Sequence, residues 1–238
     1  MQRSPSIPPP NSAPPPVPVP SPQPLPRILV TAGPTREFFD PVRFISNPSS
    51  GKMGYAIAAA AVAAGCEVEL VSGPVSLAAP AGARVTQVTT GAEMLAAADA
   101  LFPRCDILIM TAAVCDFRPK TRAPLKVKKE DVPLIAEFEP VPDILRTLAA
   151  KKRAGQIVVG FAAETDDVET HARTKLVAKK LDMIAANKVG APDAPDSAFG
   201  ADANRIILLT AGGGRSAFGP APKAQVAAFL VGEILRHR

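Results

Sequence analysis

After Arg27 the sequence alternates short apolar runs with longer segments of helical periodicity, and this alternation constrains the fold more than any other feature. The apolar runs expected to be strands lie at 28–32, 67–72, 85–88, 106–112, 157–161, 183–186 and 206–209. The segments expected to be helices lie at 50–64, 90–100, 168–181 and 222–236. Apolar strands that alternate with helices are typical of a parallel sheet covered on both faces. We therefore predict an α/β fold, a Rossmann-like three-layer sandwich with a mostly parallel sheet.

The first 26 residues differ in composition, because 12 of them are proline. A polyproline-type segment of this kind buries too little apolar surface to fold. We expect 1–26 to be a disordered proline-rich tail and 27–238 to form one domain. No apolar run reaches the roughly 18 residues that a membrane span requires, so we expect no membrane association.

Composition also bears on the compartment and on the partners. Cys66, Cys105 and Cys115 lie in or beside apolar runs, and no two of them have the spacing of metal ligands. They are expected to be small buried side chains of a cytoplasmic protein. The net charge of +5 suits anionic small molecules as well as nucleic acid. With one Tyr, no Trp and no RNA-binding aromatic motif, the chain is expected to bind no nucleic acid.

Unusual residues gather where the expected strands end. These positions hold Gly33-Pro34-Thr35, the segments 112–116 and 160–165, and Asn187. In parallel α/β folds, ligands bind beyond the carboxyl ends of the strands. The sequence therefore predicts a ligand site at this edge of the sheet.

The segment 120–140 interrupts the alternation. It opens with the basic residues Lys120, Arg122, Lys126, Lys128 and Lys129 and continues into an alternating stretch at 134–138. This pattern predicts a basic β-hairpin or flap that projects from the sheet. The alternative is a solvated charged loop.

A candidate phosphate cradle opens the first expected helix, with the residues Ser49, Ser50, Gly51, Lys52, Met53 and Gly54. Hydroxyls and a glycine at a helix N-terminus present free N–H groups and a partial positive charge, which suit a phosphate. The alternative is an ordinary helix cap. The spacing matches neither GxxxxGK[ST] nor GxGxxG, so the usual NAD fingerprint is absent.

Two further groups could bind a phosphate-rich ligand. Lys175 and Lys179 are four residues apart on one helix and could grip a triphosphate together, unless they are simply solvated. Asp116 and the segment 142–145, Pro-Asp-Ile-Leu, could bind ribose hydroxyls or Mg²⁺, or could cap loops and helices. Each group is a weak signal alone, and together they favour a phosphate-rich ligand.

No Ser/His/Asp triad can be assembled from the sequence. The two histidines are His171 and His237, and neither is expected near a strand end. His171 is expected to be exposed on a charged helix, and Glu164 has either a structural or a catalytic role.

Taken together, these segments resemble the phosphopantothenate–cysteine ligase family from about Arg27 to the C-terminus. The matching blocks stand in the family's order at 31–37, 40–47, 49–54, 112–119, 126–129, 142–145, 160–165 and Lys175…Lys179…Asp182…Asn187. Two positions depart from the family pattern: Cys115 stands where Ala is usual, and Val141 stands where Asn or Thr is common. These departures bear on contacts with the base rather than on the reaction.

The resemblance implies a two-step reaction. The carboxylate of 4′-phosphopantothenate attacks the α-phosphorus of CTP, and pyrophosphate leaves. The amine of L-cysteine then attacks the acyl-cytidylate, which forms the amide and releases CMP. The basic flap and the 49–54 block look like those of the members that use CTP rather than ATP.

The resemblance also implies roles for residues. Asn47 matches the asparagine that acts on the acyl-nucleotide, which we expect to donate a hydrogen bond to its carbonyl, and Lys126 matches a flap lysine that neutralises charge on the reacting groups. The positions that match nucleotide-binding residues are Met110, Thr111, Ala112, Asp116, Lys126, Pro142, Asp143, Ile144, Leu145, Phe161, Lys175 and Lys179. Whether Ser49–Gly54 holds nucleotide or phosphopantothenate stays open.

Cofactors and partners follow from the same resemblance. Mg²⁺ is expected to be held mainly by the nucleotide phosphates, and no FMN is expected. A homodimer is expected, with a separate phosphopantothenoylcysteine decarboxylase acting next. The rival hypotheses are an NAD(P)-dependent oxidoreductase of the Rossmann type and a non-catalytic nucleotide-binding module.

Overall fold

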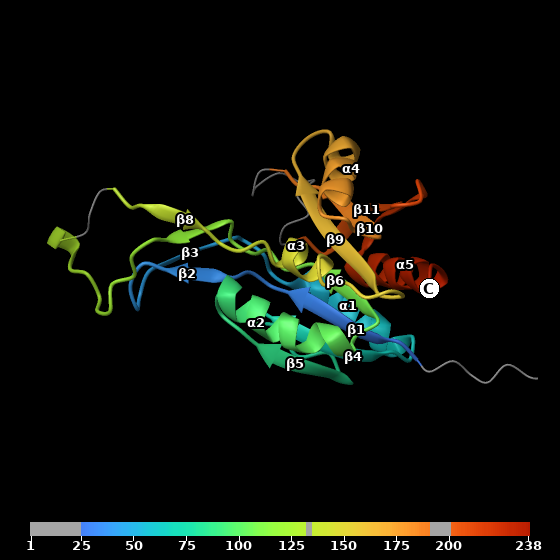
Figure 1. The fold of residues 1–238 in the computed structure, drawn as a ribbon, viewed down its shortest axis with the longest axis horizontal. Helices are drawn as coiled ribbons and strands as arrows, with labels where there is room; N and C mark the ends of the chain where they lie inside the picture. Colours follow the sequence, from blue (N-terminus) through green and yellow to red (C-terminus); the bar gives the residue numbers. More distant parts are fainter. Residues whose placement is uncertain (1–24, 132–134, 191–200) are drawn as a thin grey trace, which may run out of the picture.

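The computed structural model describes residues 25–131, 135–190 and 201–238, and its centre is one mixed sheet (Figure 1). The strand order is β12-β11-β10-β9-β6-β1-β4-β5. The six strands from β10 to β5 are parallel, whereas β11 and β12 are antiparallel to their neighbours. The strands are β1 (Arg27–Ala32), β4 (Glu67–Ser72), β5 (Ala83–Gln87), β6 (Ile107–Met110), β9 (Ile157–Glu164), β10 (Met183–Lys188), β11 (Ala203–Thr210) and β12 (Arg215–Pro222).

Helices cover both faces of this sheet. One face packs against α1 (Lys52–Ala63) and α5 (Lys223–Arg236). The other packs against α2 (Gly91–Leu101), α3 (Ile144–Ala149) and α4 (Val168–Ala178). Because side chains alternate along a strand, β1 sends Ile28 and Val30 into the first core and Leu29 into the second. The predicted three-layer α/β fold is thus confirmed.

The structure adds elements that the sequence prediction did not include. The edge strand β12 was missed because its exposure alternates and it contains Gly219-Pro220, which is atypical of strands. The short strands β2 (Arg36–Phe38) and β3 (Phe44–Ser46) were missed because each has three residues. Two 3₁₀ turns, Phe102–Arg104 and Lys129–Asp131, complete the described elements. The predicted tail at 1–26 lies outside the described residues except for its last two.

A pair of antiparallel ribbons extends away from the sheet, and we call it the arm (residues 36–46, 117–131 and 135–140) (Figure 1). One ribbon pairs β2 with β3, and the other pairs β7 (Phe117–Pro119) with β8 (Phe138–Pro140). The predicted projecting flap is confirmed as part of this arm. Its strands lie at the base of the hairpin rather than at 134–138, and residues 132–134 are outside the described part.

One buried carboxylate ties the two ribbons of the arm together. Asp40 Oδ1 accepts hydrogen bonds from the N–H groups of Val42 and Arg43, both at 2.8 Å, and Oδ2 accepts one from Val127 N–H at 3.3 Å. The side chain of Asp40 is 1% exposed and also pairs with Arg43 at 3.3 Å. The hydrogen bond from Val42, with those from Arg43 and Val127, lowers the pKa of Asp40 below its ordinary value. Asp40 therefore stays ionised at neutral pH and fixes the backbone beside Lys126.

Helix α1 approaches the sheet closely at Gly54. A Cβ added there would lie 2.4 Å from Thr111 Oγ1 and 2.5 Å from the Cβ of Ala32. Real Cβ atoms do not approach neighbours this closely, so glycine is required for the helix to lie where it does.

We expect Gly54→Ala to lower the free energy of unfolding by about 1–3 kcal/mol, which is the usual cost of overpacking. The measurement is urea denaturation followed by circular dichroism. Gly212→Ala is the matched control, because a Cβ there would meet Thr210 Oγ1 at 3.9 Å, and surface substitutions typically cost less than about 0.5 kcal/mol. Equal losses in the two variants would contradict this account of α1 packing.

Candidate functional site

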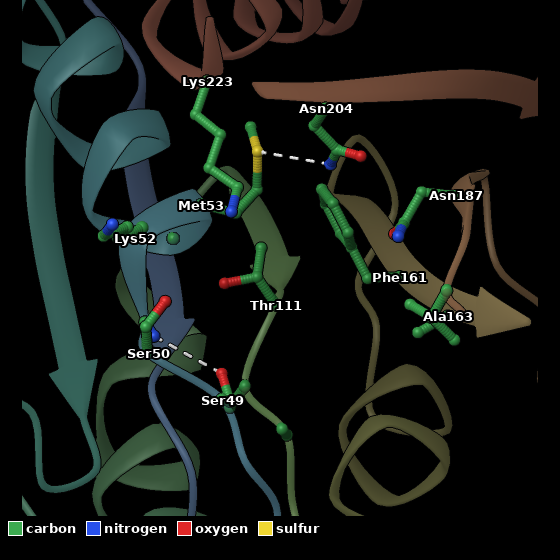
Figure 2. A pocket seen from close by; sticks show the side chains of 15 residues that line it. Ser49, Ser50, Lys52, Met53, Thr111, Phe161, Ala163, Asn187, Asn204 and Lys223 are labelled. Carbon is green, nitrogen blue, oxygen red and sulfur yellow. Dashed lines mark hydrogen bonds between the residues drawn. The ribbon is translucent and has the colours of Figure 1, made fainter. Parts of the chain in front are cut away.

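Two pockets adjoin at the carboxyl edge of the sheet, and they share the wall made by Ala112, Ala113, Phe161 and Ala163. The first, the α1 pocket, has a volume of about 140 Å³. Its other lining residues are Ser49, Ser50, Gly51, Lys52, Met53, Gly54, Thr111, Asn187, Val189, Asn204 and Lys223 (Figure 2). The second, the α3 pocket, has a volume of about 370 Å³. Its other lining residues are Asn47, Met110, Val114, Cys115, Asp116, Val141, Pro142, Asp143, Ile144, Leu145 and Lys179.

The N-terminus of α1 forms one side of the α1 pocket. The helix begins at Lys52, and its N-cap is Gly51, whose positive φ of 75° suits glycine. No side chain caps this end, and the first turn has no acidic residue. The alternative of an ordinary helix cap is borne out in part: Gly51 is the N-cap, whereas neither serine caps the helix with its side chain. The cradle predicted at Ser49–Gly54 lines a pocket and keeps the positive end of the helix dipole near it.

Two lysines complete the positive character of this pocket. Lys52 Nζ donates to Asp202 Oδ1 at 2.6 Å. Lys223, the first residue of α5, is 8% exposed and donates to the carbonyl of Ala201. Burial, and then the charge of Lys52, lower the pKa of Lys223. An anion in the pocket would relieve both effects, so the α1 pocket is suited to a phosphate group.

The sequence prediction did not include Lys223 and Asn204 in the site. Asn204 lies near the start of β11, and Lys223 is the first residue of α5. Because β11 runs antiparallel to β10, its beginning lies at the carboxyl edge of the parallel strands, and the end of β12 leads α5 back to the same edge. A lone lysine at the start of a helix gives no sequence signal of a pocket. Asn187, noted at a strand end, does line the α1 pocket.

The α3 pocket brings together most of the positions expected to bind nucleotide. Met110 and Ala112 come from β6 and the loop after it, Asp116 from the same loop, and Pro142–Leu145 from the start of α3. Phe161 lies on β9, and Lys179 directly follows α4. Thr111 instead points into the α1 pocket, because side chains alternate along the strand (Figure 2).

Asp143 organises one side of the α3 pocket. It is the N-cap of α3 and accepts from Arg146 N–H at 3.0 Å. It also pairs with Lys179 Nζ at 2.9 Å. Burial alone would raise the pKa of Asp143, but the hydrogen bonds from Lys179 and Arg146 outweigh it and lower the pKa. Lys179 is thereby held at the rim of the pocket.

The side chains of Lys175 and Lys179 do not face the same position in this structure, because each pairs with a different carboxylate. Lys175 lines neither pocket, and its Nζ lies 2.5 Å from Glu164 Oε1. Glu164 also faces His171, with 3.5 Å between Oε2 and Nδ1. Because Glu164 ends β9, the expectation that His171 lies away from strand ends is wrong: the first turn of α4 folds back over that end. The expected exposure of His171 is confirmed, at 45%.

Asn47 lies in the α3 pocket, at the point where the arm rejoins the sheet. Its Nδ2 donates to the carbonyls of Ala113 and Val114, each at 3.1 Å. The flap lysine Lys126 is exposed on the arm and lines neither pocket. The structure thus brings Asn47 to the predicted nucleotide positions and leaves Lys126 apart from them.

The cysteines are buried, as expected, and burial raises the pKa of the Cys115 thiol in the wall of the α3 pocket.

Within residues 25–131, 135–190 and 201–238, no group of three His, Cys, Asp or Glu side chains is arranged to hold a metal ion. None of the helices in these ranges is long and apolar enough to cross a membrane.

Comparison with known proteins gives a consistent result. Residues 25–237 match the family model described as the DNA/pantothenate metabolism flavoprotein C-terminal domain. The coenzyme A biosynthesis bifunctional protein CoaBC of Bacillus subtilis is 51% identical over 183 residues, which are 76% of this chain and 44% of that protein. A cysteine/cysteine sulfinic acid decarboxylase from an unidentified prokaryote is 43% identical over 210 residues, 88% of this chain and 58% of that protein. The chain therefore spans about half the length of these relatives.

A solved structure, the C-terminal domain of a coenzyme A biosynthesis bifunctional protein CoaBC, matches with a TM-score of 0.73 and 39% identity. The match covers 87% of this chain and 93% of that one. The fold and the sequence resemblance therefore extend over the same domain.

The contacts of the two α4 lysines predict different effects of substitution. On the expectation from the sequence resemblance that the α3 pocket binds CTP, Lys179→Ala should weaken that binding about 10- to 100-fold, because a lost charge-assisted contact is typically worth about 1.5–3 kcal/mol. Lys175→Ala is the matched control and should change the affinity less than about threefold, since exposed pairs contribute little. Isothermal titration with CTP alone measures both. Equal losses would instead support a clamp in which the two lysines share one anion.

Proposed function

The chain belongs to the family of the DNA/pantothenate metabolism flavoprotein C-terminal domain, and from this premise we propose that it is a phosphopantothenate–cysteine ligase. It joins the carboxylate of 4′-phosphopantothenate to the amine of L-cysteine, with CTP as the activating nucleotide. The observation that carries the proposal is the pair of pockets with a common wall at Ala112–Ala113. A ligase of this kind must hold two anionic substrates with their reactive ends in contact.

The α3 pocket suits the nucleoside. It has more than twice the volume of the α1 pocket, and the carboxylates of Asp116 and Asp143 line it. Carboxylates accept hydrogen bonds from ribose hydroxyls and from base amino groups. Lys179 supplies a cation for the phosphates at the same rim. The choice of CTP over ATP rests on the sequence resemblance, and a comparison of the two nucleotides in the assay tests it.

The α1 pocket suits the phosphomonoester of the acid substrate. Displacement at phosphorus places the attacking and leaving oxygens roughly in line, so the acid and the departing pyrophosphate lie on opposite sides of the α-phosphate. Lys179 lies on the α3 side of the common wall, whereas Lys52 and Lys223 lie on the α1 side. We therefore assign pyrophosphate to the α3 side and the phosphate of 4′-phosphopantothenate to the α1 pocket.

The reaction then follows in two steps. The carboxylate attacks the α-phosphorus at the common wall, and pyrophosphate leaves with the bonding electron pair. The acyl-cytidylate stays across the two pockets until the cysteine amine attacks its carbonyl carbon and CMP leaves. Mg²⁺ would neutralise charge on the phosphates, and the phosphates would supply most of its ligands.

The direct test is incubation of the protein with 4′-phosphopantothenate, L-cysteine and CTP, followed by mass detection of pyrophosphate, CMP and the amide. Formation of all three supports the ligase. Nucleotide binding without pyrophosphate release would favour the non-catalytic module. The decarboxylase name of one relative describes a longer protein, and we carry no decarboxylase activity over to this chain.

We expect Lys223→Ala to raise the KM for 4′-phosphopantothenate about tenfold or more, given the usual worth of a charge-assisted contact. The KM for CTP should change by less than about threefold, because Lys223 contacts only the acid substrate in this assignment. Lys151→Ala is a control that removes a lysine paired with Asp99 outside both pockets. If the KM for CTP rises instead, the α1 pocket holds nucleotide phosphates.

We also propose that the protein is a homodimer in which the arm of one copy reaches the site of the other. The arm exposes large apolar side chains, a feature that marks an interaction surface. They are Val42, Phe44, Phe117, Leu125, Ile135 and Phe138. Lys126 lines neither the α1 pocket nor the α3 pocket of its own chain, and the arm points away from the sheet (Figure 1). In a dimer, a second copy would cover the apolar surface of the arm, and Lys126 would reach the site of that copy.

Mixed dimers test this arrangement. Asn47→Ala and Lys126→Gln should each be inactive as pure dimers. After they are mixed and allowed to exchange subunits, about a quarter of the sites should contain both native residues and regain activity, since half of the dimers are mixed and each has one complete site. A mixture that stays inactive, although exchange is confirmed by native mass spectrometry, would show that Lys126 acts within its own chain.

A further inference from the structure

The loop of the arm that carries Lys126 has no regular structure of its own. Residues 120–128 belong to no helix or strand, and Lys126 is exposed. Before Lys126, the loop is anchored where Ala123 N–H donates to the carbonyl of Phe39 at 2.8 Å. An exposed lysine on a loose loop would lose conformational freedom each time it met a ligand. The contacts that hold this loop therefore decide how well Lys126 can act.

Val127, which directly follows Lys126, is held on both sides of its backbone. Val127 N–H donates to Asp40 Oδ2 at 3.3 Å, and the carbonyl of Val127 accepts from Arg43 Nη2 at 3.1 Å. Arg43 is in turn paired with Asp40, with 3.3 Å between Nη1 and Oδ2. The N–H of Val127 belongs to the planar peptide bond that follows Lys126. Its bond to Asp40 therefore fixes the backbone from which the lysine side chain extends.

The two oxygens of Asp40 accept hydrogen bonds from different parts of the arm. Oδ1 accepts from the N–H groups of Val42 and Arg43, both at 2.8 Å, and so closes a turn. An asparagine can close such a turn through its one oxygen. Oδ2 instead faces Val127 and the guanidinium of Arg43. Because a buried charge is costly without partners, the contact with the loop explains why a carboxylate rather than an amide stands here.

We infer that Asp40 is a positioning residue for the proposed reaction, and that it acts by placing Lys126. Asp40 lines neither the α1 pocket nor the α3 pocket, so it does not act on a ligand in either. The inference rests on the proposed ligase function, in which the charge of Lys126 matters most as the carboxylate of 4′-phosphopantothenate approaches CTP. Asp40 should therefore affect formation of the acyl-cytidylate and not its discharge by cysteine, although Asp40 is closer in sequence to Asn47 than to Lys126.

Asp40→Asn separates the two oxygens. Its Oδ1 can still accept from Val42 and Arg43, whereas its Nδ2 is a donor and releases Val127 N–H. The protein is mixed with 4′-phosphopantothenate and radiolabelled CTP, and rapid quench gives the rate of acyl-cytidylate formation. Cysteine is added once acyl-cytidylate has accumulated, and the rate of CMP release is measured. We expect formation to slow about 10- to 100-fold, the usual range for a misplaced group, and CMP release to stay within about threefold of wild type.

Two further variants make this comparison specific. Val127→Pro removes the donor instead of the acceptor and should show the same selective loss, so the inference is tested even if one variant does not fold. Glu137→Gln is the matched control, because it removes the same charge from the same arm. Glu137 is 75% exposed and pairs with Lys120 at 3.1 Å. Both half-reactions of this control should stay within about threefold of wild type.

Three results would overturn the inference. Similar slowing in Glu137→Gln would mean that the loss follows from charge alone. Slower CMP release in Asp40→Asn with normal acyl-cytidylate formation would mean that Asp40 acts on the segment that leads to Asn47. Unchanged rates in Asp40→Asn would mean that Lys126 does not need this anchor. Absence of acyl-cytidylate in the wild-type protein would instead refute the ligase itself.

Mixed dimers give a second measurement. In the proposed dimer, an Asp40→Asn chain has a native Asn47 and an Asn47→Ala chain has a native arm, so a mixed dimer has one complete site. Subunit exchange should raise the activity of a mixture with a tenfold-impaired Asp40→Asn protein about fivefold. Exchange with Lys126→Gln should give no rise, because both chains then carry an altered arm. A rise with Lys126→Gln and none with Asn47→Ala would overturn the inference. No rise in either mixture would contradict the dimer, whereas the half-reactions of the pure variants test Asp40 without it.

Discussion

The site depends on one backbone interaction, the pairing of β1 with β6 that continues past the ends of both strands. Beyond the regular ladder, Pro34 and Ala113 form a further parallel bridge, and Ala113 N–H donates to Gly33. These bonds hold the loop after β6 flat against the loop after β1. Because the same loop supplies the wall between the two pockets, a shift in this pairing would displace the lining of both pockets together. The hydrogen-bonded backbone of this loop therefore fixes the position of one pocket relative to the other.

The cations around the site are each held in place by a carboxylate. Lys52 pairs with Asp202, Lys179 with Asp143, and Lys175 with Glu164. Exposed pairs of this kind are worth little as stability, about 0–1 kcal/mol. For Lys52 and Lys179, which line the pockets, the pairing holds a long side chain near the rim, so that an anion could bind there without a large ordering cost; Lys175 lines neither pocket. Lys223 differs, because it is buried and close to the charge of Lys52; both features lower its pKa, and an anion beside it would offset both.

Contacts within the arm hold its two ribbons together. Asp40 joins its two ribbons through backbone N–H groups, including that of Val127, so the residue next to Lys126 has a fixed position despite its distance from the sheet. The aromatic contacts of the arm, such as Phe39 against Phe138 at 5.8 Å, stiffen it further. An arm held together in this way can place Lys126 in the site of a second copy of the chain, which is the role that we propose for it.

The sequence by itself determined the layered sheet and the edge at which the two pockets lie, because strand and helix periodicity and strand-end residues are local properties. Through the family resemblance it also predicted most of the residues that line the α3 pocket, such as Met110 and Asp116. Only the tertiary structure decided that Lys223 enters the site, that Lys175 faces Glu164, and that Asn47 donates to the loop after β6. Each of these depends on contacts between segments far apart in sequence, and such contacts are set by strand order and helix packing rather than by local pattern.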